Sequence, residues 1–256
     1  MPVDFGINFE FDRTVFDKVV DEHVENKKVG YICVVDGNNF STAKRAPLHM
    51  EVLNGSIMNN CDSTWIAKIL NWIHGTKYKH TNGPDLFLQY IKKQKYKHMF
   101  LGASKNVLDG LKAEMTKLDP EVANLRFEEL PFRKVEEFDY EGIAAMINEE
   151  APDIIWVSLG APKQEQFMYY LKPYLNQGVM FGVGAAFNFY CGQVNAPKRA
   201  PKWIRRIGME WVYRIFSEPK KQLKRNFIFL IDLPSAIRKE IKKKNALKKN
   251  KKQNVQ

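Results

Sequence analysis

The chain has 256 residues, 45% of them apolar and 12% aromatic, which suits a sizeable α/β domain and excludes a disordered or fibrous protein. Its three cysteines, Cys33, Cys61 and Cys191, form no CxxC motif or Cys/His cluster, so neither a disulfide framework nor a zinc site is indicated and a reducing cytosol fits best. No run of about 18 apolar residues could span a bilayer, and the N-terminus lacks the pattern of a signal peptide.

The formal net charge of +11 is concentrated at one end of the chain. Residues 198–256 hold 19 Lys and Arg against 4 Asp and Glu, a balance of +15, whereas residues 1–197 have a balance of −4. An acidic body joined to a basic tail indicates a domain that does chemistry and a segment that meets a polyanionic surface or ligand. We expect an α/β catalytic domain over 1–197, a basic amphipathic appendage over 198–241 and a disordered Lys-rich tail over 242–256.

Apolar periodicity predicts strands that alternate with helices. The pattern is that of an α/β fold with a mostly parallel sheet flanked by helices. In chain order the predicted elements are a helix over 14–28 with Thr14 as its N-cap, strands over 31–35 and 56–58, a helix over 65–73, a strand over 99–101, helices over 107–118 and 140–149, a strand over 154–159, a helix over 164–175 and a strand over 179–184.

Ligands of such sheets bind beyond the carboxyl ends of the strands. The small and polar segments that follow the predicted strands should therefore converge on one cleft. These segments are 36–39, 62–63, 102–104, 160–165 and 184–188.

Asp62 follows a predicted strand inside a polar cluster. A carboxylate at that place suits a general base that takes a proton from an attacking hydroxyl. It also suits the N-cap of the next helix, and on the pattern alone the cap is favoured two to one because capping is common.

Four other segments allow both a ligand site and an ordinary structural role. TNGPD (81–85) is either an anion or sugar site at a helix start or a turn with a cap. Lys163, Gln164 and Glu165 are either a ligand-contacting cluster or a solvated first turn. The turns at 102–104 and 160–162 are weak nucleotide signals, because neither forms a GxGxxG or Walker motif.

Residues 199–225 interleave cations with large apolar residues, including Trp203, Trp211 and Phe216. A basic amphipathic helix with Trp and Tyr is typical of a membrane headgroup boundary. An RNA-binding tail and a merely solvated face are the alternatives. The membrane surface is favoured because the apolar residues are large, numerous and helically spaced.

Three runs together resemble the WecG/TagA/CpsF family, which is glycosyltransferase family 26. They are DIIWVSLGAPKQE (153–165), GVGAAFNFYCG (182–192) and RAPKWIRRIGMEWVYRIFSEPKK (199–221). DGNN (36–39), NNCDS (59–63), TNGPD (81–85) and FLGAS (100–104) fall where the family has its other ligand-facing segments, so the resemblance spans about residues 30–225.

The resemblance implies a Rossmann-like fold of the GT-E type and an inverting, metal-independent hexosyltransferase with no cofactor. The implied donor is a UDP-sugar, UDP-N-acetylmannosamine or its uronic acid, and the implied acceptor is undecaprenyl-diphosphate-linked N-acetylglucosamine. The products are wall teichoic acid, enterobacterial common antigen, capsule or exopolysaccharide. The implied location is cytoplasmic and peripheral, at the anionic inner face of the plasma membrane. A homo-oligomer is left open.

By position in the family's motifs, Asp62 matches the proposed catalytic base, which reverses the preference for a helix cap. Asn38, favoured over Asn39, matches an asparagine that contacts the donor sugar. Gln164 and Glu165 match a pair beside the nucleotide. We also place Ser63, Gly83, Asp85, Gly102, Gly160 and Asn188 at the donor, and Arg199, Arg206, Arg214, Lys221 and Arg225 at the diphosphate leaving group or the membrane.

The sequence departs from the family pattern at three places. Asn188 replaces the usual aspartate, Ser63 follows the base where many members have glycine, and Lys220 and Lys221 replace an arginine pair and lose its bidentate geometry. These changes leave another UDP-hexose, such as UDP-glucose or UDP-N-acetylglucosamine, as an alternative donor. The rival of a different class is a non-enzymatic nucleic-acid-binding protein, which the basic tail motivates, although we expect no nucleic-acid partner.

Overall fold

The computed structural model describes residues 3–196, 199–206 and 209–253. Its centre is a six-stranded sheet in which every pairing is parallel, with the strand order β4-β3-β8-β7-β5-β6. The expected α/β fold with a parallel sheet is therefore confirmed. The strands are β3 (Val29–Val35), β4 (Met58–Cys61), β5 (His98–Gly102), β6 (Phe127–Glu128), β7 (Ile154–Ser158) and β8 (Gly178–Gly182), and the short β1 (Val3–Asp4) and β2 (Ile7–Asn8) form a separate antiparallel pair.

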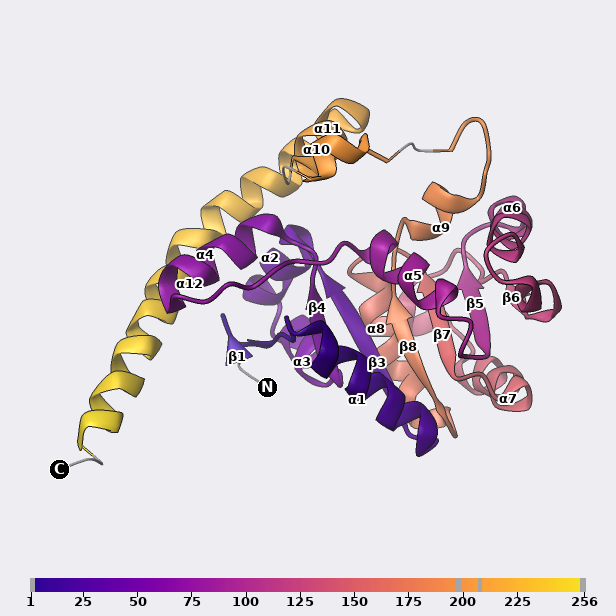
Figure 1. Cartoon of the computed structure of the whole chain (residues 1–256), viewed down its shortest axis with the longest axis horizontal. Coiled ribbons are helices and arrows are strands. Elements are labelled where there is room, and N and C mark those ends of the chain that lie inside the picture. The colour runs from indigo at the N-terminus through magenta and orange to yellow at the C-terminus, as the bar shows by residue number, and fades with distance from the viewer. Residues whose placement is uncertain (1–2, 197–198, 207–208, 254–256) are drawn as a thin grey trace.

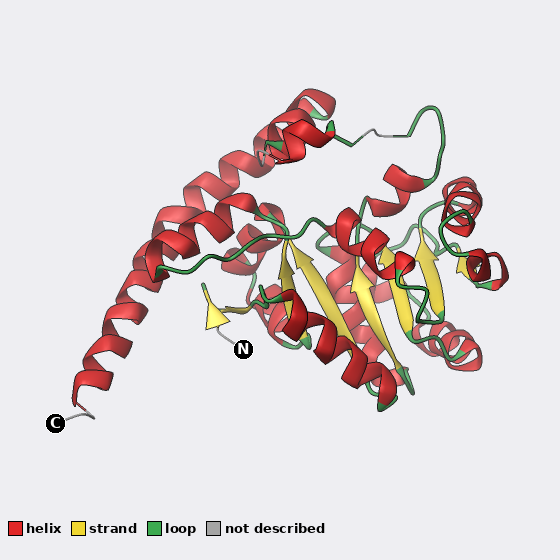
Figure 2. Cartoon of the chain, viewed as in Figure 1, coloured by secondary structure: helices red, strands yellow, loops and turns green. Residues whose placement is uncertain are grey.

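Helices cover both faces of the sheet (Figures 1 and 2). The strands are mostly apolar because each face is buried, so alternate residues such as Tyr31 and Ile32 enter two different cores. One core contains residues of α2 (Gly37–Arg45), α3 (Pro47–Asn54), α4 (Thr64–His74), α7 (Tyr140–Glu150), α8 (Lys163–Leu171) and α12 (Pro219–Gln253). The other contains residues of α1 (Arg13–Glu25), α5 (Gly83–Lys92), α6 (Lys105–Thr116) and α9 (Ala186–Tyr190).

The remaining helices complete the connections. Three single-turn 3₁₀ helices span Pro120–Asn124, Val135–Glu137 and Lys172–Tyr174. After α9 the chain crosses to α10 (Lys202–Arg206) and α11 (Glu210–Ser217), which lie at the start of α12 (Figure 1). Among the described residues, no helix is long and apolar enough to cross a membrane.

Most expected boundaries differ from the structure by a few residues, and two of the differences involve polar side chains. The N-cap of α1 is Asp12 rather than Thr14, because the Asp12 carboxylate accepts from the backbone N–H of Thr14 at 2.8 Å. The strand expected at 56–58 is β4 (Met58–Cys61), so the polar Asn59 and Asn60 lie within it. The strand tolerates them because their side chains find backbone partners, such as the bond from Asn59 Nδ2 to the carbonyl of Leu53 at 2.8 Å.

α12 continues without a break across residues 241 and 242, where we expected the appendage to end and the disordered tail to begin. Its inner face joins the core of the body, where Phe229 and Ala236 are buried and Phe229 packs edge-on against Phe40. Arg45 of α2 also binds Asp232 through two guanidinium nitrogens, at 2.9 Å. The helix projects past the body at its C-terminal end (Figure 1), and residues 242–253, expected to be disordered, are helical there.

Candidate active site

Two adjoining hollows form a cleft at the carboxyl edge of the sheet. The strand-end hollow lies where β3 and β8 end and where the loop after β7 begins, and its lining includes Asn39, Gly160, Gln164, Gly184 and Asn188. The tryptophan hollow lies between the starts of α4 and α5 and the helices α11 and α12, and its lining includes Asn38, Ser63, Trp65, His80, Glu210 and Trp211. Asp36, Asp62, Pro84, Arg214, Gln222 and Arg225 line both hollows.

The strand-end hollow lies at the switch point of the sheet. The chain passes from β3 to β4 on one side, whereas β8 and β7 lie on the other side of β3. Parallel α/β sheets bind their ligands at such a point, beyond the carboxyl ends of the strands. Of the five segments expected to converge, those at 36–39, 62–63, 160–165 and 184–188 do so, whereas 102–104 lines neither hollow.

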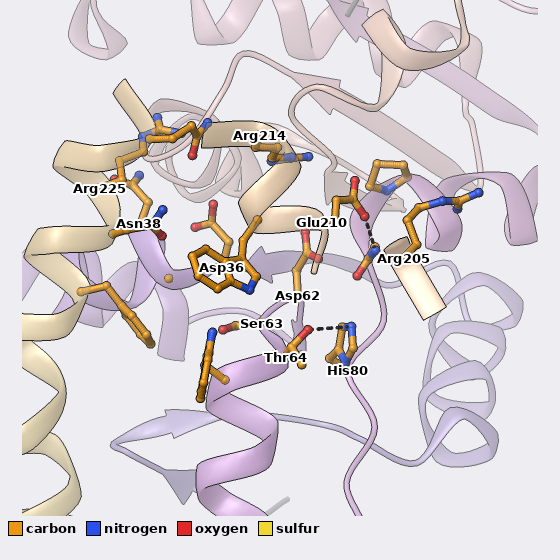
Figure 3. Close-up of a pocket in the computed structure, with 18 residues that line it drawn as sticks. Asp36, Asn38, Asp62, Ser63, Thr64, His80, Arg205, Glu210, Arg214 and Arg225 are labelled. Carbon is orange, nitrogen blue, oxygen red and sulfur yellow. Dashed lines mark hydrogen bonds between the residues drawn. The ribbon is translucent and has the colours of Figure 1, made fainter. Parts of the chain in front are cut away.

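Asp62 directly follows β4 and lies at the centre of the site, between Thr64 on one side and Glu210 and Arg214 on the other (Figure 3). Its backbone N–H donates to the carbonyl of Val35 at 2.9 Å, which ties it to the end of β3. The cap of α4 is Ser63, whose hydroxyl accepts from the N–H of Ile66 at 3.3 Å. The interpretation of Asp62 as the helix cap is therefore wrong, and its carboxylate faces the cleft.

The surroundings of Asp62 raise its pKa to about 7. The largest cause is burial, which disfavours the charged form, and the nearby charges of Asp36 and Glu210 add to it. The Arg214 guanidinium and a hydrogen bond from the Gly83 backbone act in the opposite direction. A carboxylate with a pKa near the working pH is suited to general-base catalysis.

Gln164 and Glu165 open α8 and belong to a buried hydrogen-bond network. Gln164 Oε1 accepts from the N–H of Gly184 at 2.9 Å, and its Nε2 donates to Glu165 Oε1 at 2.9 Å. Asn39 Nδ2 donates to the same carboxylate oxygen at 3.1 Å, while Asn39 Oδ1 contacts His49 Nε2 at 3.0 Å. Glu165 is fully buried and lines neither hollow, and burial raises its pKa to about 7. Glu165 therefore holds in place the amides of Asn39 and Gln164, both of which line the strand-end hollow.

The three expected donor glycines are placed differently. Gly160 lies in the strand-end hollow with a φ of +77°, a conformation that glycine adopts readily. Gly184, not among the three, has a φ of +52° in the same hollow. Gly83 lies behind Asp62 and donates to it. Gly102 lies outside both hollows. Glycine is required there by the φ of +92° and by the close approach to β7, since a Cβ would stand 2.6 Å from the carbonyl oxygen of Ser158.

Asp85 and Arg199 contact each other rather than the cleft. The Arg199 guanidinium, only 10% exposed, donates to both oxygens of Asp85 at 2.6 and 3.2 Å and to the hydroxyl of Tyr190 at 2.7 Å. Glu210 of α11 lies 3.6 Å from Arg199 and accepts from Asn82 Nδ2 at 2.8 Å. Arg205 also reaches Asp85, at 3.3 Å. These contacts fasten α10 and α11 to the start of α5.

Arg214 and Arg225 line both hollows, and Arg205 lines the tryptophan hollow as well. The Arg214 guanidinium also lies over the ring of Phe189, 5.4 Å from its centroid. Arg206 and Lys221 were expected here as well, but their side chains lie outside the described part of the chain.

Asp36 was expected at the cleft only as part of 36–39, and His80, Glu210 and the two tryptophans of the cleft were given no role in the site. Trp65 was counted in the apolar stripe of α4, whereas the buried residues of that helix are Ile66, Ala67, Leu70 and Ile73. Trp65 is 48% exposed and faces the cleft. Its place one residue before the buried stripe is the signal that could have identified it.

Comparison with known proteins identifies the family of the chain. The sequence model of the glycosyl transferase WecG/TagA/CpsF family matches residues 5–250. The N-acetylglucosaminyldiphosphoundecaprenol N-acetyl-beta-D-mannosaminyltransferase of Bacillus subtilis (strain 168) is 27% identical over 210 residues, which cover 80% of this chain and 79% of that protein. The enzyme of the same name from Staphylococcus aureus (strain MW2) is 25% identical over 245 residues, 91% of this chain and 92% of that protein.

The chain therefore belongs to the WecG/TagA/CpsF family of glycosyltransferases, as its motifs indicated. It is an enzyme of the hexosyltransferase class.

Proposed function

We propose that this enzyme moves N-acetylmannosamine or its uronic acid, with inversion, from a UDP-sugar to an undecaprenyl-diphosphate-linked N-acetylglucosamine in the assembly of a cell-surface polysaccharide. The observation that carries the proposal is Asp62, a carboxylate with a raised pKa that lies between a glycine-lined hollow and two arginines. The names of the relatives supply the sugar and the acceptor.

The strand-end hollow is suited to the nucleotide-sugar donor. Gly160 and Gly184 let a ligand approach the backbone closely, because neither has a side chain. Gln164 and Asn188 provide amides for hydroxyl or base recognition. Arg214 and Arg225 provide the positive charge that a diphosphate requires.

The reaction is a single displacement. Asp62 takes the proton of the acceptor hydroxyl, whose oxygen attacks the anomeric carbon of the donor from the face opposite UDP. The bond from that carbon to the β-phosphate oxygen breaks, and UDP leaves with the negative charge. Arg214 and Arg225 stabilise that charge in a partly enclosed cleft, where fixed cations act strongly, so the proposal includes neither a metal ion nor a cofactor.

The C-terminal helices are suited to the inner face of the plasma membrane, where a lipid-linked acceptor would be met. They expose large apolar side chains among the lysines and arginines of the tail, and each cation contributes about 1 kcal/mol at an anionic leaflet. The exposed apolar residues are Trp203, Met209, Phe216, Leu223, Phe227, Leu230 and Ile231.

The test is a donor panel with a short-chain lipid-diphosphate N-acetylglucosamine as acceptor. UDP-N-acetylmannosamine, its uronic acid, UDP-glucose and UDP-N-acetylglucosamine are compared by UDP release and mass spectrometry, with and without EDTA. We expect one of the first two to give product in EDTA and the Asp62→Asn variant to give almost none. Product only from a different donor, or only without EDTA, would overturn that part of the proposal.

A parallel titration addresses the rival class of protein. RNA and vesicles containing an anionic phospholipid are titrated at matched salt, because both interactions depend on charge. We expect vesicle binding. Tight RNA binding by a protein that releases no UDP with any donor would instead establish a nucleic-acid-binding protein.

A further inference from the structure

The tryptophan hollow has a composition that the catalytic base does not explain. Trp65 of α4 and Trp211 of α11 lie edge to face, with ring centroids 6.4 Å apart and planes at 63°. Both side chains line the hollow, and Trp65 remains 48% exposed although tryptophan is strongly apolar. Two indoles presented to an open, polar cleft indicate a ligand with a flat apolar face.

Polar groups surround the two indoles. Thr64 Oγ1 lies 3.1 Å from His80 Nε2, and Asn82 Nδ2 donates to Glu210 Oε2 at 2.8 Å (Figure 3). Thr64 and Glu210 retain further hydrogen-bonding capacity, since a hydroxyl or carboxylate oxygen accepts more than one bond. A pyranose ring has the matching chemistry, because its C–H groups form an apolar face and its hydroxyls point outward around the edge.

The position of the hollow determines which sugar it would hold. In an inverting displacement the acceptor hydroxyl attacks the anomeric carbon of the donor from the face opposite the leaving UDP, and the base lies on the acceptor side. The strand-end hollow lies at the switch point and suits the donor, and Asp62 lines both hollows. We propose, on the basis of the proposed function, that the tryptophan hollow is the acceptor-sugar subsite and that Trp65 and Trp211 contact the apolar face of the acceptor N-acetylglucosamine.

The experiment replaces each tryptophan in the full-length enzyme and measures KM for the acceptor and for the donor separately. Trp65→Ala and Trp211→Ala should each raise the acceptor KM about tenfold or more, as expected for loss of an aromatic contact, and change the donor KM less than twofold. Trp65→Phe keeps a flat ring and should recover most of the loss. Trp72→Ala is the matched control, because Trp72 is also on α4 and 72% exposed but lines neither hollow.

Binding without turnover gives a second measurement. A soluble N-acetylglucosamine diphosphate lacking the long lipid is titrated by calorimetry into the wild type and the Trp65→Ala and Trp72→Ala variants. We expect binding to weaken only in Trp65→Ala. Equal rises in donor and acceptor KM, or acceptor binding unaffected by the loss of either cleft tryptophan, would overturn the subsite. Failure of the proposed function would appear differently, as a wild-type enzyme that transfers no N-acetylmannosamine or its uronic acid to this acceptor.

Discussion

Arg199 and Asp85 form a bidentate ion pair that joins the segment before α10 to the first turn of α5. Its distances are 2.6 Å from Arg199 Nη1 to Asp85 Oδ1 and 3.2 Å from Arg199 Nη2 to Asp85 Oδ2. From the sequence, Asp85 was expected at the donor and Arg199 at the diphosphate leaving group or the membrane, whereas in the structure they bind each other. Since Arg199 also contacts Glu210, the pair holds the helix that carries Trp211 and Arg214 over the cleft. Asp85 and Arg199 are thus placed to act on catalysis through the position of α11.

Arg199→Ala should loosen α11. The substitution removes the guanidinium that joins Asp85 to Glu210, although Asp85 keeps Arg205 and Glu210 keeps Asn82 as partners, a loss of about 1.5–3 kcal/mol for hydrogen bonds between charged groups. We expect faster limited proteolysis between residues 193 and 218 and a fall in kcat, with Arg199→Lys intermediate because it keeps the charge but loses the fork. Asp109→Asn is the control, because its ion pair with Lys105 is exposed. Wild-type proteolysis in Arg199→Ala would contradict the assignment.

Asp62→Asn should lower kcat by about 10²–10⁴-fold, the usual contribution of a general base. In the wild type kcat/KM should rise with pH and level off above about 7, because only the deprotonated carboxylate accepts a proton. Asp36→Asn keeps a side chain that can cap α2 and removes a charge that raises the pKa of Asp62. The rise of kcat/KM with pH should therefore occur at lower pH in this variant. A rise at the wild-type pH would argue against the electrostatic coupling of Asp36 and Asp62.

Asp62→Asn should also stabilise the protein at neutral and alkaline pH. Because the pKa of Asp62 is raised from 3.8 to about 7 in the folded state, the folded protein retains a proton that the unfolded chain has released. Stability therefore falls as pH rises through that window and stays lowered above it. Asp62→Asn removes this effect, and we expect a gain on the order of 1–4 kcal/mol at pH 8. Urea denaturation at pH 8 and at pH 4 should show the gain only at the higher pH.

Glu165→Ala should raise the donor KM about tenfold, because the buried amides of Asn39 and Gln164 lose their shared acceptor, at about 1–3 kcal/mol. Glu165→Gln retains an acceptor oxygen of the same shape and should keep most of the activity. Steady-state kinetics and thermal melts of the two variants test this. Equal damage in both would show that the charge of Glu165, rather than its acceptor oxygen, is needed.

Removing residues 199–256 should destabilise the body as well as abolish transfer. The deletion takes away Phe229, Ala236 and Glu240, which are buried against it, and each large apolar side chain contributes about 1.5–3 kcal/mol. Removal of only 245–256 should leave the melting temperature nearly unchanged, since Lys243 and Lys244 still reach the carbonyls of Val3 and Ile73. A 1–198 fragment with a wild-type melting temperature would show that α12 is only an appendage.

Local pattern was sufficient to predict the fold but not the role of Asp62. Apolar strand cores and their polar ends place the loops at one edge of a parallel sheet by geometry alone. The choice between base and cap depended on the family resemblance, because Asn59 and Asn60 look like a loop although they lie in β4. Only the structure shows that Ser63 takes the cap and leaves Asp62 in the cleft.

The long-range pairings could not be predicted in the same way. Arg199 and Asp85 are 114 residues apart, and nothing in either neighbourhood indicates the other. The Lys-rich end of α12 looks disordered by composition, but its lysines are good helix formers and the helix is already fixed upstream by packing against α2. Such features depend on tertiary contacts that a local pattern does not contain.

α12 takes part in two separate regions of the molecule. Near its start it supplies Gln222, Arg225 and Phe229 to the cleft, and further along Glu240 accepts from the N–H of Phe5 at 2.7 Å beside the N-terminal strands. The 15 helical steps from Arg225 to Glu240 span about 22 Å. A force applied to the exposed side of α12 by a bilayer would therefore reach an arginine of the cleft at one end and the N-terminal strands at the other.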